Sequence, residues 1–338
     1  MMAKVAVLGA GSWGTILANL LVGNNHEVKL YGNNQQCVDE INNEHTNKHY
    51  LPEFSINEKL TATTDLKEAV KDVDIVLFVI PTQVIREVAK KLAVILNETN
   101  ASPILVTASK GLEQGTYERI SEVLAEVVPE ENRSGIVVLS GPSHAEDVAN
   151  KDITTLAAAS TQVDKAEYVQ QVFMNDYFRL YTNEDVIGVE MGAALKNVIA
   201  IGAGTLHGLG YGDNTKAALI TRGLAEITRL GIAMGANPLT FSGLSGVGDL
   251  IVTCTSVNSR NWRFGNALGK GEKVNDILEN MGMVVEGVAT CKAAFELAEK
   301  QNVDMPITNA IYQVVYGNMQ VDDVIKKLMG RSGRSEME

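Results

Sequence analysis

The chain has 338 residues, with 45% hydrophobic and 5% aromatic side chains, 30 glycines and a formal net charge of −12. This length exceeds what one ordinary core fills, so we expect a globular protein of two domains. The negative charge would repel nucleic acid and anionic membrane surfaces, so an anionic substrate would need a local basic site. The apolar run at 191–212 is long enough to span a bilayer, but glycines and Lys196 dilute it, so we expect no stable membrane insertion.

Neither the cysteines nor the histidines predict a metal site. Cys37, Cys254 and Cys291 are odd in number and far apart, which indicates a reducing compartment without disulfides. His45 and His49 are four residues apart, but the glutamate of a zinc-binding helix is missing and the surroundings are typical of a loop. The first apolar strand begins almost at once, leaving no room for a signal peptide. We therefore expect a cytoplasmic protein without a metal.

The first half of the chain alternates short apolar runs with helical periodicity. Such runs predict strands at residues 5–8, 28–31, 75–80, 104–108 and 136–140, and we expect residues 154–159 and 178–181 to extend the sheet. Helices are predicted between them, including those at 84–96 and 117–127. Short apolar runs separated by helices indicate parallel strands covered on both faces. The pattern predicts an α/β, doubly wound sheet.

A glycine-rich turn follows the first strand. Gly9, Gly11 and Gly14 form the pattern G-x-G-x-x-G between that strand and a predicted helix at 15–21. The first glycine permits a tight turn, the second lets a pyrophosphate approach the backbone, and the third lets helix and strand pack closely. The helix N-terminus adds free N–H groups. The first domain is therefore predicted to be a Rossmann-type dinucleotide-binding domain.

The end of the second strand bears on the choice between NAD and NADP. An NAD-selective site usually carries Asp or Glu there, but this chain has Tyr31-Gly32-Asn33-Asn34. No carboxylate would repel a 2′-phosphate and no arginine would grip one. We expect NADP or dual use of NAD and NADP rather than strict NAD selectivity. Lys48 is either a phosphate contact or a solvated loop lysine.

Beyond about residue 188 the strand signals stop. Helical patterns follow at residues 189–206, 215–234, 261–268, 290–300 and 310–316. We therefore expect a dinucleotide-binding domain at 1–188, an all-α substrate and catalytic domain at 189–330, and a polar tail at 331–338.

Lys196 is the only formally charged side chain between residues 191 and 212. A helix that is apolar on every face is buried, and a buried ammonium costs several kcal/mol. Lys196 is therefore the candidate catalytic residue. As a general acid or base it would give a proton to a carbonyl oxygen during reduction and take it back during oxidation. Burial and Lys110 would lower its pKa, and Asp249 would raise it.

Other candidate substrate residues lie in loops and at a helix start. Lys110 follows the strand at 104–108, and residues 141–144 follow the strand at 136–140, where an open α/β sheet binds its ligand. Asp249 ends a glycine-rich turn at 243–250. Residues 259–261, Ser-Arg-Asn, begin a helix with Ser259 as N-cap, and together offer a backbone dipole, planar donors and amide donors to a phosphate.

These motifs occur in order in a known family. They are Gly9-x-Gly11-x-Trp13-Gly14, Ser109-Lys110-Gly111, Ser140-Gly141-Pro142-Ser143, Leu195-Lys196-Asn197-Val198, Gly246-x-Gly248-Asp249-Leu250 and Ser259-Arg260-Asn261. Over roughly residues 3–330 the chain resembles the bacterial NAD(P)-dependent glycerol-3-phosphate dehydrogenases. The resemblance implies a Rossmann-type domain with a helical second domain, as in 6-phosphogluconate dehydrogenase. It also implies reversible reduction of dihydroxyacetone phosphate to sn-glycerol 3-phosphate, which feeds phospholipid synthesis.

The resemblance also implies residue roles, with Lys196 as proton donor and acceptor. The implied substrate contacts are Lys110, Gly141, Ser143, Asn197, Asp249, Ser259, Arg260 and Asn261, and Thr253, one helical turn past Asp249, joins them. Together with Gly9, Gly11 and Gly14, the implied cofactor contacts are Ser12, Trp13, Asn33, Lys110, Ala145, Arg260, Val284 and Glu286. The family often carries Arg or His near the end of the second strand, where this chain has Gly32-Asn33.

Two other readings stay open. The chain could act on another phosphorylated substrate such as 6-phosphogluconate, although the Ser-Arg-Asn start at 259–261 favours a three-carbon phosphate. It could also be a non-catalytic dinucleotide sensor, which would be expected to lose the lysine or the substrate loop. By analogy alone, we expect a homodimer through the helical domain.

Overall fold

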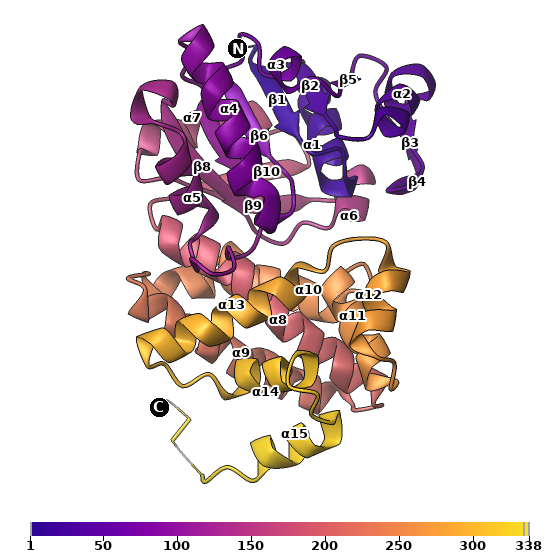
Figure 1. Ribbon diagram of the computed structural model, residues 1–338, viewed down its shortest axis with the longest axis vertical. Helices are drawn as coiled ribbons and strands as arrows, with labels where there is room; N and C mark the ends of the chain where they lie inside the picture. The colour runs from indigo at the N-terminus through magenta and orange to yellow at the C-terminus, as the bar shows by residue number, and fades with distance from the viewer. Residues whose placement is uncertain (1, 334, 337–338) are drawn as a thin grey trace.

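The computed structural model describes residues 2–333 and 335–336, and it places the sheet above a helical domain (Figure 1). Within these residues an eight-stranded sheet has the order β10-β9-β8-β7-β6-β1-β2-β5. Its strands are β1 (Lys4–Leu8), β2 (Glu27–Tyr31), β5 (Thr61–Thr63), β6 (Ile75–Phe78), β7 (Ile104–Thr107), β8 (Gly135–Ser140), β9 (Thr154–Ala159) and β10 (Phe178–Asn183). The predicted doubly wound α/β domain is confirmed.

Two strands at one edge of the sheet run antiparallel to the rest of it. β8 pairs with β9 antiparallel, with Val138 opposite Ala159, whereas β9 and β10 are parallel to each other. The segments at 154–159 and 178–181 thus extend the sheet, but reversed. The β8–β9 connection contains only the five-residue helix α6 (Ala145–Ala149), which does not return the chain to the opposite end of the sheet. A parallel crossover usually needs a longer helical connection.

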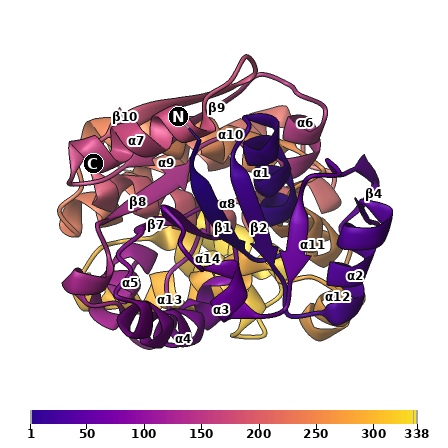
Figure 2. The same cartoon turned by 90° about the horizontal axis from the view of Figure 1, so that it is seen from above.

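Helices cover both faces of the sheet (Figure 2). Alternate side chains of β1 separate the two layers: Val5 and Val7 pack with α1 and α7, whereas Ala6 and Leu8 pack with α4 and α5. The helices of this domain, besides α6, are α1 (Ser12–Gly23), α2 (Gln35–Glu44), α3 (Leu66–Ala69), α4 (Ile85–Thr99), α5 (Ile120–Val127) and α7 (Val163–Phe173). Short 3-10 turns are η1 (Thr82–Val84) and η2 (Glu130–Asn132).

Two local features differ from the sequence prediction. The helix predicted from residue 117 begins at Ile120, because Tyr117 has φ +65° and Arg119 is extended, and neither conformation is helical. A small antiparallel hairpin, β3 (Thr46–Asn47) and β4 (Leu51–Ser55), was not predicted. This hairpin matters because it packs beside the glycine-rich turn.

The second domain is built around α8 (Val186–Gly208). This helix is long and apolar enough to cross a membrane, but 83% of its most apolar stretch is buried within the protein. It crosses α11 (Arg260–Gly269) at very short range. A Cβ on Gly204 would lie 2.0 Å from the carbonyl oxygen of Trp262, and one on Gly265 would lie 1.9 Å from that of Ile201. The paired glycines therefore allow backbone-to-backbone packing, and α8 forms the core of the helical domain, as predicted.

The remaining helices surround α8 (Figure 1). They are α9 (Asp213–Ala233), α10 (Asp249–Thr255), α12 (Val274–Met281), α13 (Glu286–Gln301), α14 (Pro306–Val315) and α15 (Val321–Met329), with the short turns η3 (Pro238–Ser242) and η4 (Leu244–Gly248). Of the predicted tail at 331–338, residues 334 and 337–338 lie outside the described residues. Arg331 pairs with Asp304 at 2.7 Å, so the start of the tail is anchored.

Candidate active site

The glycine-rich turn has the geometry that a dinucleotide requires. Gly9 has φ +123°, and a Cβ there would lie 2.3 Å from the carbonyl oxygen of Val79. A Cβ on Gly14 would lie 1.9 Å from the carbonyl oxygen of Gly9, whereas a Cβ on Gly11 would meet nothing within 4 Å. Gly9 and Gly14 therefore close the turn against the sheet, and Gly11 leaves open the space before the N-terminus of α1. These residues fit a pyrophosphate.

The β3–β4 hairpin holds this turn from the side. Asn47, which is fully buried, donates from Nδ2 to the carbonyl oxygen of Ala10 and to Oγ1 of Thr15, both at 2.9 Å. The hydroxyl of Ser12 donates to the carbonyl oxygen of Tyr50 at 3.1 Å. Sequence reasoning missed Asn47 and Tyr50, because an Asn or Tyr in a polar loop carries no pattern that marks it. Together they fix the first turn of α1.

The end of β2 is neutral, as its sequence indicated. Asn33 is exposed, and the side chain of Asn34 accepts from the backbone N–H of Gln36 at 2.9 Å, which caps α2. Lys48 is exposed and pairs with Glu44. That ion pair favours the interpretation of Lys48 as a solvated loop lysine.

Lys196, Lys110 and Asp249 form one buried cluster. The ammonium of Lys196 donates to Oδ1 of Asp249 and, at 2.8 Å, to Oγ1 of Thr253. The ammonium of Lys110 donates to Oδ2 of Asp249 at 2.7 Å and to the carbonyl oxygen of Gly141 at 3.1 Å. Asp249 is 1% exposed and Lys196 is 5% exposed. One carboxylate therefore lies between two ammonium groups from different domains.

Burial and charge set the protonation of this cluster. Burial lowers the pKa of Lys196 to about 7; the Asp249 carboxylate opposes this shift, and the Lys110 ammonium adds to it. Burial also opposes ionisation of Asp249, yet the ammonium groups of Lys110 and Lys196 hold its pKa below the usual value. Asp249 thus stays ionised near neutral pH, whereas Lys196 exchanges its proton there. A lysine that titrates near neutrality is suited to general acid–base catalysis.

A second group of side chains surrounds the start of α11. Ser259 caps that helix, since its hydroxyl accepts from the backbone N–H of Trp262 at 3.2 Å. The amide of Asn261 donates from Nδ2 to Oδ1 of Asn197 at 2.9 Å and accepts from the backbone N–H of Gly287 at 2.8 Å. These bonds join α8, α11 and α13. The Ser259 N-cap was predicted, but the Asn197–Asn261 bond was not.

Arg260 and Glu286 face the sheet domain from the helical one. The Arg260 side chain is exposed and donates to the carbonyl oxygen of Val284 at 3.0 Å. The Glu286 carboxylate accepts from the backbone N–H of Thr82 at 3.1 Å. Burial raises the pKa of Glu286, and the hydrogen bonds from Thr82 oppose this shift. The link joins the loop after β6 to the first turn of α13.

The loop after β8 faces α10. Gly141 has φ +149°, and the hydroxyl of Ser143 donates to its carbonyl oxygen at 3.0 Å. A ring nitrogen of His144 lies 3.4 Å from the carbonyl oxygen of Val252, and burial lowers the pKa of His144. Ala145 begins α6 and is buried. The described residues hold no cluster of three or more His, Cys, Asp or Glu side chains suited to a metal ion.

Most of the predicted residues fall into three groups, each held together by its own contacts: the lysine–aspartate cluster, the start of α11, and the glycine-rich turn. Within the part of the chain that the structure describes, Lys196 bonds to Asp249 and Thr253 and forms no hydrogen bond with Asn33 or Ser143. A dinucleotide bound at the glycine-rich turn would be expected to extend along the carboxyl ends of the strands, where Lys110 and Gly141 lie.

A glycine-rich sheet domain joined to a helical domain with a buried, titratable lysine defines a dinucleotide-dependent dehydrogenase. Within that class, the chain belongs to the NAD-dependent glycerol-3-phosphate dehydrogenase family. The models of its N-terminal and C-terminal domains match residues 4–166 and 185–326. The resemblance seen in the sequence motifs is confirmed.

Relatives match over the whole chain. A protein of Latilactobacillus sakei named glycerol-3-phosphate dehydrogenase [NAD(P)+] is 71% identical over 100% of this chain and 99% of its own. A protein of Enterococcus faecalis with the same name is 64% identical over 100% of this chain and 98% of its own. The crystal structure of glycerol-3-phosphate dehydrogenase from Coxiella burnetii is 35% identical, with a TM-score of 0.92 over 98% of this chain and 99% of that one.

Proposed function

We propose that the chain catalyses the reversible reduction of dihydroxyacetone phosphate to sn-glycerol 3-phosphate with NADH or NADPH, and so supplies the glycerol backbone of phospholipids. The observation that carries this proposal is the Lys196–Asp249–Lys110 cluster. Asn197, the residue after Lys196, bonds to Asn261 at the start of α11, which carries donors suited to a phosphate, and the sheet domain carries the glycine-rich turn. The names of relatives that match the full chain support the same reaction.

Lys196 is proposed as the proton donor to the carbonyl oxygen during reduction and as the acceptor during oxidation. The bound nicotinamide would supply or accept the hydride. With its pKa near 7, Lys196 is populated in both protonation states at neutral pH, so it can act in either direction. The hydrogen bonds to Asp249 and Thr253 fix its position before the substrate arrives.

Asp249 and Lys110 are proposed to orient the substrate. Asp249 would accept a hydrogen bond from a substrate hydroxyl, and Lys110, which is 16% exposed, would attract the anionic substrate and contact the cofactor. The two lysines keep Asp249 ionised, so it acts only as an acceptor. Gly141 and Ser143 are proposed to contact the substrate as well.

The start of α11 is proposed to bind the substrate phosphate. Free backbone N–H groups, the planar guanidinium of Arg260 and the amides of Asn197 and Asn261 supply donors of complementary geometry. Ser259 caps the helix and completes the set. For the cofactor we propose contacts from Gly9, Gly11, Ser12, Trp13, Gly14, Asn33, Lys110, Ala145, Arg260, Val284 and Glu286.

The organisation of the protein is proposed along the same lines. Residues 1–188 would form the dinucleotide-binding domain and residues 189–330 the catalytic domain, in a cytoplasmic homodimer joined through the helical domain. Size-exclusion chromatography with light scattering tests the dimer, which a monomer mass would exclude.

The reaction is tested by following loss of reduced nicotinamide absorbance when purified protein is mixed with dihydroxyacetone phosphate and either NADPH or NADH. Oxidation with the phosphorylated substrate, absent with unphosphorylated dihydroxyacetone, supports the proposal. If protein that binds the dinucleotide oxidises neither cofactor with dihydroxyacetone phosphate, but does oxidise one with a longer phosphosugar ketone, the three-carbon substrate is excluded.

A further inference from the structure

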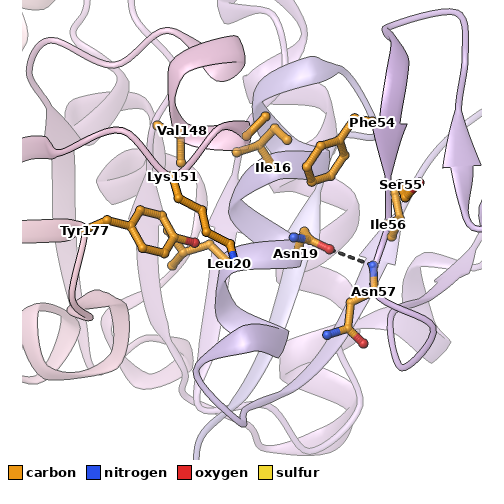
Figure 3. A pocket seen from close by; sticks show the side chains of 11 residues that line it. Ile16, Asn19, Leu20, Phe54, Ser55, Ile56, Asn57, Val148, Lys151 and Tyr177 are labelled. Carbon is orange, nitrogen blue, oxygen red and sulfur yellow. Dashed lines mark hydrogen bonds between the residues drawn. The ribbon is translucent and has the colours of Figure 1, made fainter.

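A separate cavity of about 250 Å³ lies between α1, β4 and α6, and none of the proposed site residues lines it (Figure 3). Part of its wall is apolar, with Leu20 from α1, Phe54 from β4 and Val148 from α6. Its volume suits a small organic molecule and is below the usual range for drug-sized ligands. The proposed reaction leaves this cavity without a role.

The polar part of the wall consists of Lys151, Tyr177, Asn19, Asn57 and Ser55, of which the first three offer donor groups. Figure 3 shows the Lys151 side chain extending past Tyr177 toward Leu20 on α1, with the amide of Asn19 on the same helix. Oδ1 of Asn19 accepts from the backbone N–H of Asn57 at 2.7 Å, which leaves its Nδ2 group as a donor. Among the described residues, the Lys151 ammonium and the Tyr177 hydroxyl form no hydrogen bond or ion pair.

The charge of the cavity contrasts with that of the chain. The protein carries a net charge of −12, yet the cavity wall includes a lysine and no Asp or Glu. Lys151 follows the C-terminal end of α6 with φ +60°, which directs the chain away from that helix. Lys151 is exposed, and its unpaired ammonium beside two neutral donors and an apolar wall is complementary to an amphiphilic anion.

We propose that this cavity binds a small monocarboxylate with an apolar body. One ammonium compensates one negative charge, whereas a phosphate dianion would keep a charge without a partner. The Tyr177 hydroxyl and the Asn19 amide would donate to the carboxylate together with Lys151, and the apolar body would pack against Phe54 and Leu20.

The position of the cavity links it to the dinucleotide. Its walls continue from Ser12 at the start of α1, from Ala145 at the start of α6, and from Tyr50, whose carbonyl oxygen holds Ser12 at 3.1 Å. A ligand that fixes these three elements to one another lowers the cost of ordering them around a dinucleotide. Carboxylate binding therefore strengthens NADPH binding. This coupling rests on the proposed cofactor roles of Ser12 and Ala145, whereas carboxylate binding itself does not.

The test is calorimetric titration of the full-length protein with benzoate, with benzamide as the neutral molecule of the same shape and phenyl phosphate as the dianion. We expect saturable binding of benzoate and much weaker binding of the other two. Lys151→Met should weaken benzoate binding roughly tenfold or more, because it removes a charged hydrogen bond. Tyr177→Phe should weaken it less. Lys165→Met, which removes a lysine of α7 paired with Asp164, is the matched control.

Three results would overturn the binding site: no saturable binding of benzoate, equal binding of benzamide, or benzoate binding that Lys151→Met leaves unchanged. Phenyl phosphate could also bind at the start of α11, the proposed phosphate site. If Lys151→Met does not change the heat of phenyl phosphate binding, that binding occurs at the substrate site, and the cavity prefers a carboxylate. The coupling is measured as the Kd of NADPH with and without saturating benzoate. A Kd that does not fall excludes the coupling, and failure of catalysis with dihydroxyacetone phosphate would leave the carboxylate titration unaffected.

Discussion

Lys110 and Lys196 reach the same carboxylate from different domains: Lys110 donates to Oδ2 of Asp249 at 2.7 Å, and Lys196 donates to Oδ1. Lys110 follows β7 of the sheet domain, and Lys196 lies in the middle of α8. The carboxylate thus couples the position of the sheet domain to that of Lys196, the proposed catalytic residue. It also separates two positive charges that would otherwise repel each other in a buried space.

Replacing Asp249 tests this coupling. Asp249→Asn leaves two buried ammonium groups without their counter-charge, and breaking a buried pair in this way costs about 3–5 kcal/mol of stability. We expect a lower melting temperature and a still lower pKa for Lys196, because Asp249 is the group that raises it. Asp213→Asn, which changes a carboxylate with 98% exposure on α9, is the control and should behave like the wild type.

The pKa of Lys196 predicts opposite pH profiles for the two directions. Reduction needs the protonated ammonium, so kcat for dihydroxyacetone phosphate should fall as pH rises through about 7. Oxidation of sn-glycerol 3-phosphate needs the neutral amine, so its kcat should rise over the same interval. If the Asp249→Asn variant keeps some activity, the pH at which its kcat changes should be lower than in the wild type. Initial rates between pH 5 and pH 9 provide the measurement, and profiles of the same sign in both directions would contradict the role of Lys196.

The neutral end of β2 predicts weak discrimination between cofactors. Asn33→Asp would place a carboxylate where the ribose 2′-phosphate of NADPH is expected, and it should lower the ratio of kcat/KM for NADPH to that for NADH by roughly tenfold or more. Asn33→Ala adds no charge and should leave the ratio nearly unchanged. An unchanged ratio in Asn33→Asp would show that the 2′-position lies elsewhere.

Glu226 predicts a pH effect on stability that is independent of catalysis. Its carboxylate is 1% exposed and accepts from the backbone N–H groups of Ile307 and Thr308 at 2.6 and 3.0 Å, at the start of α14. Burial raises its pKa to about 7, so the folded protein binds a proton that the unfolded chain has released. Stability from this group is therefore present below the unfolded pKa of about 4.5 and is lost as pH rises through about 7.

Glu226→Gln should remove this pH dependence, because glutamine does not titrate. As pH rises from 4.5 to 7, the melting temperature of the wild type should fall relative to that of the variant. A difference that stays constant with pH would mean that Glu226 does not change protonation on folding.

The sequence predicts best where a side chain conflicts with its surroundings. Lys196 stands out because it is charged within an apolar helix, and the structure buries it as expected. The strand positions also follow from short apolar runs. Strand direction does not, because an apolar run has the same pattern in a parallel and an antiparallel pair, so the reversed direction of β9 and β10 could not be predicted.

Other features depend on contacts that no local pattern contains. Asn47 lies in a two-residue strand of polar sequence, and its importance appears only when the hairpin is seen against Ala10 and Thr15. The left-handed backbone of Tyr117 ends the apolar periodicity without any change in composition. The bond between Asn197 and Asn261 joins helices 64 residues apart in the chain.

The measurement that tests the central claim most directly is the single-turnover rate of hydride transfer from NADPH to dihydroxyacetone phosphate in Lys196→Ala, with the affinities for both molecules measured alongside. If Lys196 donates the proton, the rate should fall by roughly 10²–10⁴ while NADPH still binds as in the wild type. A rate close to that of the wild type, with both affinities unchanged, would contradict the proposed mechanism.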